Sequence, residues 1–155
     1  MPGLDISKIT DYLFISAYPE GTHAEEIQSL NVRLILSMHW LPLDMKLNHP
    51  PLKVLWLPTF DNPWLKMPMK SLMRGVQAAL PVIDSGHAVL THCAAGKHRS
   101  VAMACSVLIA KGFSADEAMA CVKAGRSVAD PDIPHIQERI RKFEYVILKS
   151  SPTLG

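Results

Sequence analysis

The sequence predicts an α/β fold in which a central, mostly parallel sheet of four to five strands is flanked by helices. Short apolar, β-rich segments alternate along the chain with segments of helical spacing, and this alternation is typical of a parallel sheet covered by helices. The chain has 155 residues, of which 48% are apolar and 19% charged. This length is enough to bury a substantial core. We therefore expect one domain over residues 1–155, with a disordered tail at 150–155.

Four segments are predicted as strands because they are rich in β-branched and large apolar residues. They are Tyr12–Ile15, Arg33–Ser37, Leu52–Leu57 and Ala88–Thr91. Prolines interrupt the middle third of the chain, so we expect loops at Trp40–Asn48 and Thr59–Met67.

Capping motifs and breakers delimit the expected helices. Thr22–Glu25 reads as a capping box that opens a helix to about Leu30, and Ser114–Glu117 as a second one that opens a helix to about Ala124. A further helix starts near Lys70, and Pro81 should kink or end it.

Two more helices are expected after the fourth strand. The run Val101–Ala110 is apolar on every face, which predicts a central buried helix with Gly112 as its C-terminal stop. The last helix is expected from about Pro134 to about Lys149.

Charge and cysteine content limit the partners and the compartment. A net charge of +2 is too small to indicate nucleic-acid binding. Three cysteines without a C-x-x-C pair favour a reducing, cytoplasmic environment. The N-terminus lacks a basic region followed by an apolar one, and the run Val101–Ala110 is too short to span a bilayer. We therefore expect no signal peptide and no membrane insertion.

The segment His92–Ser100 predicts an oxyanion-binding loop, since an apolar strand precedes it and an apolar helix follows. The loop N–H groups, the N-terminus of the helix and the Arg99 guanidinium would surround a bound anion with hydrogen-bond donors. The same positive potential favours the thiolate of Cys93 over the thiol. These residues therefore predict phosphoryl transfer through a phosphocysteine.

The same segment fits the His-Cys-x5-Arg-Ser/Thr signature of the cysteine-based phosphatases. The rest of the chain is similar to their compact, atypical dual-specificity branch. Ile9–Ile15 resembles the opening strand of that branch, Leu57–Asp61 its general-acid loop, and Arg126–Asp132 the segment before its last helix. The resemblance implies the dual-specificity phosphatase fold and a protein-tyrosine or dual-specificity phosphatase activity.

Roles for the loop residues follow from this chemistry and from the resemblance. Cys93 is the expected nucleophile, and Arg99 is expected to bind two equatorial phosphate oxygens. Ser100 is expected to hydrogen-bond the sulfur, and His92 to orient the loop. The expected substrate-binding residues are Ala94, Ala95, Gly96, Lys97, His98 and Arg99. No metal or cofactor is expected.

The expected general acid is Asp61, because an alkoxide or phenoxide leaves poorly without a proton. Asp61 lies on a proline-bracketed loop that is able to close over the site, and it would later act as the base on the attacking water. Asp44 is the alternative acid. Asp132 has two candidate roles, positioning that water or capping the helix that begins near Pro134.

Competing interpretations of the loop fit the residues less well. A nucleotide P-loop needs glycine at position 91 and Ser or Thr at position 98, where the chain has Thr91 and His98. The metal-binding side chains of the region match no structural zinc spacing, and the charge of Arg99 would repel a cation. They are His87, His92, Cys93 and His98.

Several other side chains have two open interpretations. Cys105 and Cys121 are expected as small core residues, with a regulatory disulfide to Cys93 as the alternative. Trp64 follows the acid loop and is a candidate for the mouth of the pocket. Arg126 is a candidate for the pocket rim or for a structural ion pair.

The loop also indicates two substrate classes. The compact chain favours a shallow pocket that admits phosphotyrosine, phosphoserine and phosphothreonine in proteins. Lys97 and His98 resemble the loop of phosphatases acting on inositol pyrophosphates, so inositol phosphates and phosphoinositides are the alternative. Ala94 and Ala95 replace the basic residues of those enzymes. An inactive phosphopeptide-binding module is the second alternative, although it would require loss of the nucleophile, the arginine or the acid.

Overall fold

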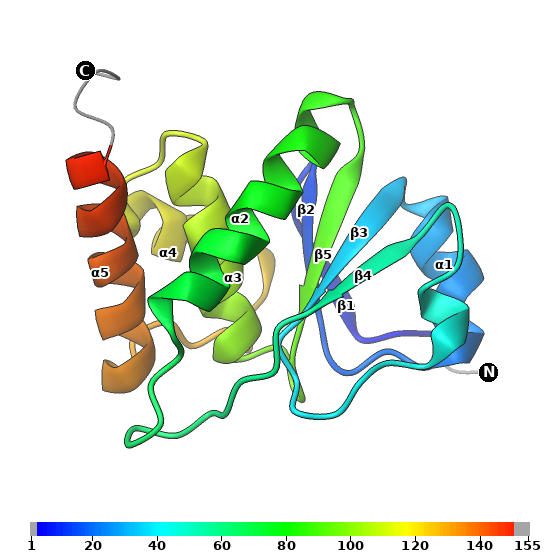
Figure 1. Cartoon of the computed structure of the whole chain (residues 1–155), viewed down its shortest axis with the longest axis horizontal. Helices are drawn as coiled ribbons and strands as arrows, with labels where there is room; N and C mark the ends of the chain where they lie inside the picture. Colours follow the sequence, from blue (N-terminus) through cyan, green and yellow to red (C-terminus); the bar gives the residue numbers. More distant parts are fainter. Residues whose placement is uncertain (1–2, 151–155) are drawn as a thin grey trace.

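The computed structural model describes residues 3–150 and contains one five-stranded sheet with helices on both faces (Figure 1). The strand order is β1-β2-β5-β3-β4, and every neighbouring pair is parallel except β1 with β2. The strands are β1 Ile6–Thr10, β2 Leu13–Ser16, β3 Val32–Ser37, β4 Lys53–Trp56 and β5 Ala88–His92. The predicted α/β class with a mostly parallel sheet of four to five strands is confirmed.

The sequence pattern did not predict β1 as a strand of its own. It pairs with β2 as an antiparallel hairpin at the edge of the sheet. None of its five residues is fully buried, so it lacks the apolar run that marks the inner strands. The start of β1 lies beside the carboxyl end of β2, since Ile6 is aligned with Ser16, and this brings Asp5 and Ser7 to the edge of the sheet where the parallel strands end.

Residues 3–150 also form five α-helices and two short 3-10 helices, and three of the α-helices follow the last strand. The helices are η1 Gly21–His23, α1 Ala24–Ser29, η2 Met45–Leu47, α2 Met69–Asp84, α3 Arg99–Ala110, α4 Ala115–Gly125 and α5 Pro134–Ser150. The disordered tail expected from position 150 is wrong at that position, since Ser150 is the last residue of α5; positions 151–155 lie outside the described residues. No helix among residues 3–150 is long and apolar enough to cross a membrane.

The helix ends test the capping predictions. Ser114 and Glu117 form the predicted capping box of α4, and Gly112 follows α3 with a positive φ of 109°. The box predicted at Thr22 is wrong: Glu20 and His23 form it, at the start of η1. Helix α2 continues through Pro81 and ends three residues later at Asp84. Proline has no N–H for the carbonyl four residues before it, so its place in the last turn costs the helix one hydrogen bond near its end.

The core has two layers, one on each face of the sheet. Helices α2 to α5 cover one face, and α1 with its flanking loops covers the other (Figure 1). Every residue of α3 except the last is buried, as its uniformly apolar composition predicts. The helix is therefore held rigidly against the sheet, with its N-terminus at the carboxyl end of β5.

The register of the three inner strands defines the place of the site. Ser16 of β2 and Ser37 of β3 are both aligned with His92, the last residue of β5. Three strands thus end at one level, and the chain between β5 and α3 starts there. Ligands bind at this edge of open parallel sheets because loops and helix N-termini converge on it.

Candidate active site

Residues Cys93–His98 form the loop between β5 and α3, called here the Cys loop. Cys93 is only 3% exposed, and its Sγ lies 3.1 Å from Ser100 Oγ in the first turn of α3. Thr91 Oγ1 donates to the Ser100 carbonyl at 2.9 Å and fixes the start of the helix to the strand. The sulfur therefore lies at the positive end of a buried helix.

The surroundings of Cys93 favour its thiolate. Burial raises the pKa of the thiol, since it disfavours the charged form. Hydrogen bonds from the side chain and backbone of Ser100, the charge of Arg99 and the N–H of Gly96 lower it by more. The net pKa lies below its ordinary value, so Cys93 is a better nucleophile near neutral pH than an ordinary cysteine.

Arg99 is the first residue of α3 and is 8% exposed. One of its terminal nitrogens donates to the Thr59 carbonyl at 2.7 Å and to the Met38 carbonyl at 3.3 Å. Among the buried side-chain nitrogen and oxygen atoms of residues 3–150, the Arg99 Nε has no hydrogen-bond partner. A buried N–H without a partner is costly, and an anion in the Cys loop would supply the missing acceptor.

His92 is fully buried at the end of β5 and is held by two contacts. Its Nδ1 lies 3.1 Å from the Cys93 carbonyl and its Nε2 lies 2.7 Å from Ser37 Oγ. A carbonyl only accepts, so Nδ1 carries the hydrogen and Nε2 accepts from the serine hydroxyl. Burial lowers the pKa of His92 to about 4. The ring is therefore neutral and fixes the carbonyl of the nucleophile, the orienting role expected for it.

Gly96 has a positive φ of 68°, a backbone conformation that residues other than glycine rarely adopt. A Cβ at this position would lie 2.8 Å from the Ser16 carbonyl oxygen and 2.8 Å from an Arg126 nitrogen. Both the backbone conformation and the close approach therefore require glycine.

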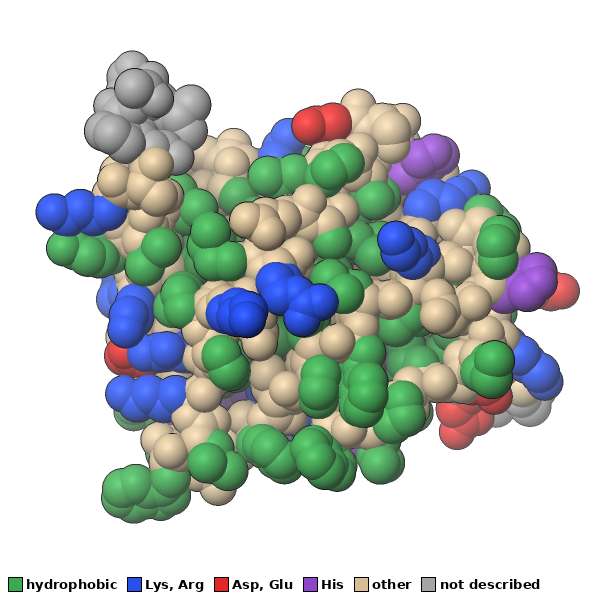
Figure 2. Space-filling model, in the orientation of Figure 1, with side chains coloured by type: hydrophobic (Ala, Val, Ile, Leu, Met, Phe, Trp, Pro, Cys, Tyr) green, Lys and Arg blue, Asp and Glu red, His purple; other side chains and the backbone are tan. Residues whose placement is uncertain are grey.

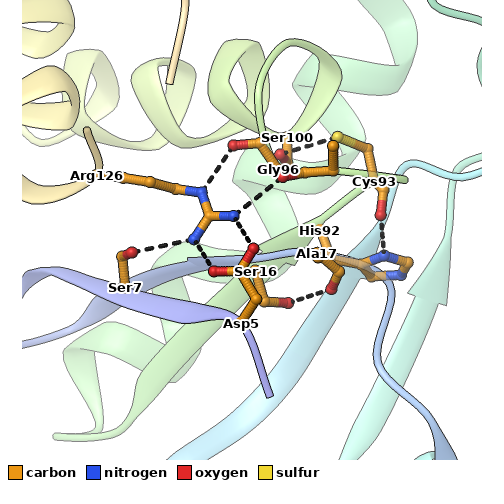
Figure 3. A network of polar contacts seen from close by, with 10 residues as sticks. Asp5, Ser7, Ser16, Ala17, His92, Cys93, Gly96, Ser100 and Arg126 are labelled. Carbon is orange, nitrogen blue, oxygen red and sulfur yellow. Dashed lines mark hydrogen bonds and ion pairs between the residues drawn. The ribbon is translucent and has the colours of Figure 1, made fainter. Parts of the chain in front are cut away.

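Arg126, the residue after α4, holds the outer side of the Cys loop (Figure 3). It is 2% exposed, and its guanidinium donates to the carbonyls of Gly96 at 2.9 Å and Ala95 at 3.0 Å. Because these carbonyls bond outward, the N–H groups of the same loop are left for the inner side. Of its two open interpretations, the contacts favour a structural role for Arg126.

The opposite edge of the Arg126 guanidinium is bound by the β1 hairpin region. Asp5 accepts from two of its nitrogens at 3.1 and 2.9 Å, and Ser7 Oγ accepts at 3.0 Å (Figure 3). The N-terminal edge strand, which the sequence pattern did not separate, therefore supports the loop through one arginine.

Asp61 lies over the Cys loop through a contact with His98. Its Oδ2 is 2.6 Å from His98 Nδ1, and its Oδ1 is 2.7 Å from His135 Nε2 at the start of α5. Burial raises the pKa of Asp61, and the hydrogen bonds and charges of His135 and His98 together lower it by more. The structure thus brings the expected acid to the same loop as Cys93 and Arg99.

The alternative candidates lie in other environments. Asp44 Oδ1 accepts from the Lys46 N–H at 2.8 Å and caps η2. Asp132 accepts from Lys123 Nζ at 2.7 Å. Trp64 is 88% exposed, so it protrudes into solvent.

The remaining cysteines and the histidines form no second centre. Cys105 is buried, which raises its thiol pKa, and Cys121 is half-buried. All three cysteines are free. Within residues 3–150 no group of three or more His, Cys, Asp or Glu side chains is arranged to hold a metal ion.

Sequence reasoning missed several contributors to the site, among them Ser37, Thr59 and His135. Ser37 could have been found because it is the last residue of one predicted strand and His92 directly follows another. Parallel strands end at the same edge of the sheet, so the two side chains are expected to lie close together. Thr59 acts through its backbone carbonyl, which no side-chain pattern marks. His135 is 74 residues away from its partner Asp61, so only the tertiary fold reveals it.

The chain matches no protein-family model. It is 29% identical over 147 residues to human dual specificity protein phosphatase 22, covering 92% of this chain and 75% of that protein. Among solved structures, human DUSP28 is similar with a TM-score of 0.82 and 23% identity, covering 95% of this chain and 97% of that one. PTPMT1 in complex with PI(5)P has a TM-score of 0.84 and 24% identity, covering 95% and 99%. Both solved structures share the fold of this chain.

Proposed function

Since the chain is a cysteine-dependent phosphatase of the compact, atypical dual-specificity branch, we propose that it hydrolyses phosphotyrosine, phosphoserine and phosphothreonine in proteins. The observation that carries this proposal is the buried Cys93 sulfur, 3.1 Å from Ser100 Oγ and beside the unpartnered Nε of Arg99. A thiolate and a free guanidinium donor in one anion-binding loop are what phosphocysteine chemistry needs.

In the first step the Cys93 thiolate attacks phosphorus in line with the leaving oxygen. The S–P bond forms while the P–O bond breaks, and the leaving oxygen takes a proton from Asp61. Arg99 and the loop N–H groups hold the three equatorial oxygens, whose charge is more dispersed in the transition state. The products of this step are the dephosphorylated alcohol or phenol and phosphocysteine.

In the second step water attacks the phosphorus of phosphocysteine. Asp61, now a carboxylate, takes a proton from the water as the new P–O bond forms. The P–S bond breaks, and the hydroxyl of Ser100 donates to the departing sulfur across the 3.1 Å contact. Inorganic phosphate leaves, and the thiolate and the protonated acid are restored.

The exposed side chains of the Cys loop support a protein substrate. Ala94, Ala95 and Lys97 are exposed, whereas His98 is engaged by Asp61. Of these two basic residues, only Lys97 is therefore left to contact further phosphates of a substrate. A single lysine offers little to the additional phosphates of a polyphosphorylated inositol, and the two alanines leave room for a peptide backbone.

An inositol phosphate or phosphoinositide is the second candidate substrate. Lys97 makes no ion pair within residues 3–150 and could reach a second phosphate. The solved complex of PTPMT1 with PI(5)P shows a fold like this one holding a phosphoinositide, which adds to the same case.

We also propose that residues 1–155 work as one catalytic domain in a reducing compartment such as the cytoplasm. Three free cysteines, one of them the nucleophile, suit such an environment. Oxidation would otherwise consume the thiolate that catalysis needs.

A side-by-side substrate panel tests the function. Purified protein is assayed on phosphotyrosine, phosphoserine and phosphothreonine peptides, inositol polyphosphates, inositol pyrophosphates and phosphoinositide vesicles under one set of conditions, with a chelator present. We expect the highest kcat/KM on phosphopeptides and no activity in C93S. Higher kcat/KM on inositol compounds would replace the protein assignment, and full activity in C93S would refute the phosphocysteine mechanism.

A further inference from the structure

The acid expected at Asp61 is bound on both carboxylate oxygens by histidines from two separate elements. His98 belongs to the Cys loop, and His135 is the second residue of α5. The two contacts are 2.6 Å and 2.7 Å long, and the ring centroids of the two histidines lie 6.4 Å apart. The three side chains therefore form one unit over the loop that holds the nucleophile.

The unit is shielded, so its contacts are worth more than those of a surface pair. The side chains of His135, His98 and Asp61 are 13%, 21% and 33% exposed. Partly buried hydrogen bonds to a charged group are stronger and less screened than exposed ones. An ionised carboxylate only accepts, so His98 Nδ1 and His135 Nε2 carry the hydrogens.

We propose that His135 is a positioning residue for the general acid: from the rigid start of α5, it holds Asp61 against His98 and so closes the acid loop over the Cys loop. This inference rests on the proposed role of Asp61 in catalysis. It adds α5, a helix outside the sequence motif, to the machinery of the proton transfer.

Two features favour positioning over a passive surface contact. The acid loop is already tied to the site at Thr59, whose carbonyl accepts from Arg99 at 2.7 Å. Beyond Thr59 no strand supports the loop, since β4 ends at Trp56, and the side-chain hydrogen bonds of Asp61 within residues 3–150 are those with the two histidines. Without His135, Asp61 would keep one lateral contact and gain freedom to rotate away from the leaving oxygen.

The arrangement leaves Asp61 able to deliver a proton. A carboxyl oxygen has two lone-pair positions, so a protonated Asp61 can accept from an imidazole and still point its O–H at the leaving oxygen. In the second step, the carboxylate takes the proton from the attacking water with both histidines unchanged. Neither histidine has to gain or lose a proton during turnover.

Other charges also face this unit. Asp130, in the segment between α4 and α5, lies 4.0 Å from His98 Nε2, and Lys97 and Arg99 flank His98 along the chain. Near the start of α5, Asp132 is paired with Lys123. Because hydrogen bonds from His135 and His98 lower the pKa of Asp61, removing the His135 donor should raise that pKa.

The test uses three variants of the full chain and two substrates. His135→Leu removes the donor, and His135→Gln keeps an N–H at a similar reach without a titrating ring. His87→Leu is the matched control: it removes a histidine that pairs with Asn31 just before β5, at the far end of that strand. Each variant is assayed with phenyl phosphate, a poor leaving group, and p-nitrophenyl phosphate, a good one, across the pH range.

We expect H135L to lose about 10-fold in kcat on phenyl phosphate and less than about 2-fold on p-nitrophenyl phosphate, a fraction of the general-acid contribution. The basic limb of its pH profile should move to higher pH. H135Q should recover most of the phenyl phosphate rate, and H87L should behave like the parent. Far-UV circular dichroism of each variant checks that it is folded.

D61N separates failure of this inference from failure of the proposed function. If D61N loses activity selectively on phenyl phosphate but H135L does not, the positioning role of His135 is wrong. If D61N shows no leaving-group selectivity, Asp61 is not the acid and the proposed function itself must change. If H135L and H135Q lose equally on both substrates, His135 is merely structural and the inference is overturned.

Discussion

Replacing Arg126 by Met should damage both the stability of the fold and the activity of the site, because one buried guanidinium orients the Cys loop. The side chain is 2% exposed and donates to the carbonyls of Ala95 and Gly96. Methionine fills much of the same space but donates nothing, so both carbonyls lose their partner. The N–H groups on the inner side of the loop then lose the constraint that aims them.

The size of the effect follows from these contacts. A hydrogen bond to a charged group contributes about 1.5–3 kcal/mol, so the two carbonyl bonds together contribute about 3–6 kcal/mol. The pair with Asp5 adds less than about 1 kcal/mol, because the Asp5 side chain is 67% exposed. The total free energy of unfolding of such a domain is about 5–15 kcal/mol, so the loss is a large fraction of the total stability.

Urea unfolding followed by tryptophan fluorescence measures the first effect, and kcat/KM on p-nitrophenyl phosphate the second. We expect R126M to lose about 3–6 kcal/mol of unfolding free energy and, because oxyanion donors are misaligned, about 100-fold in kcat/KM. Arg141→Met is the control, since it breaks an exposed pair with Asp116 (47% and 79% exposed). An R126M protein as stable and as active as R141M would refute the reasoning.

Three further predictions concern the same loop. Gly96→Ala should lower kcat/KM at least 10-fold. Gly86 also has a positive φ, of 90°, but open space around it, so Gly86→Ala should cost only the roughly 1–2 kcal/mol of stability of a left-handed residue; equal activity in both variants would contradict the packing argument. The pKa of His92 falls from its ordinary 6.5 to about 4 on folding, so the unfolded state binds more protons between these values and stability should drop by up to roughly 3 kcal/mol as pH falls through that window. Urea unfolding of H92Q between pH 4 and pH 7 should lack that part of the slope, and an unchanged slope would assign it to other groups. Ser100→Ala should slow hydrolysis of phosphocysteine more than its formation. Stopped-flow traces should then show a burst of phenol before a slow steady state. A loss of rate without a burst would place the role of Ser100 in the first step.

Much of the fold could be predicted because the inner strands and the buried helix have local signals. The strands around Leu34 and Val89 are continuous apolar runs, and α3 is apolar on all faces, so their places in the fold follow from composition. The edge strand β1 has no such run, and the helix start near Thr22 depends on which of several polar residues caps it. Glu20 forms the capping box with His23, and the backbone N–H of Glu20 donates to His23 Nδ1.

The Cys loop could be predicted in detail because its function requires residues that are adjacent in sequence. Cys93, Gly96, Arg99 and Ser100 lie within one strand-to-helix connection, and their spacing carries the chemistry. The supports of that loop are different. Arg126 reaches it from 30 residues away and His135 reaches Asp61 across 74, so the residues that aim the site became visible only in three dimensions.

Trapping the covalent intermediate tests the central claim most directly. The enzyme is mixed with p-nitrophenyl phosphate, quenched in acid during turnover, digested and examined by mass spectrometry, with S100A used to increase the trapped fraction. The account predicts one phosphoryl group on the peptide that contains Cys93, attached to its sulfur. A phosphoryl group on any other side chain, or turnover by C93S at the parent rate with no trapped species, would contradict it.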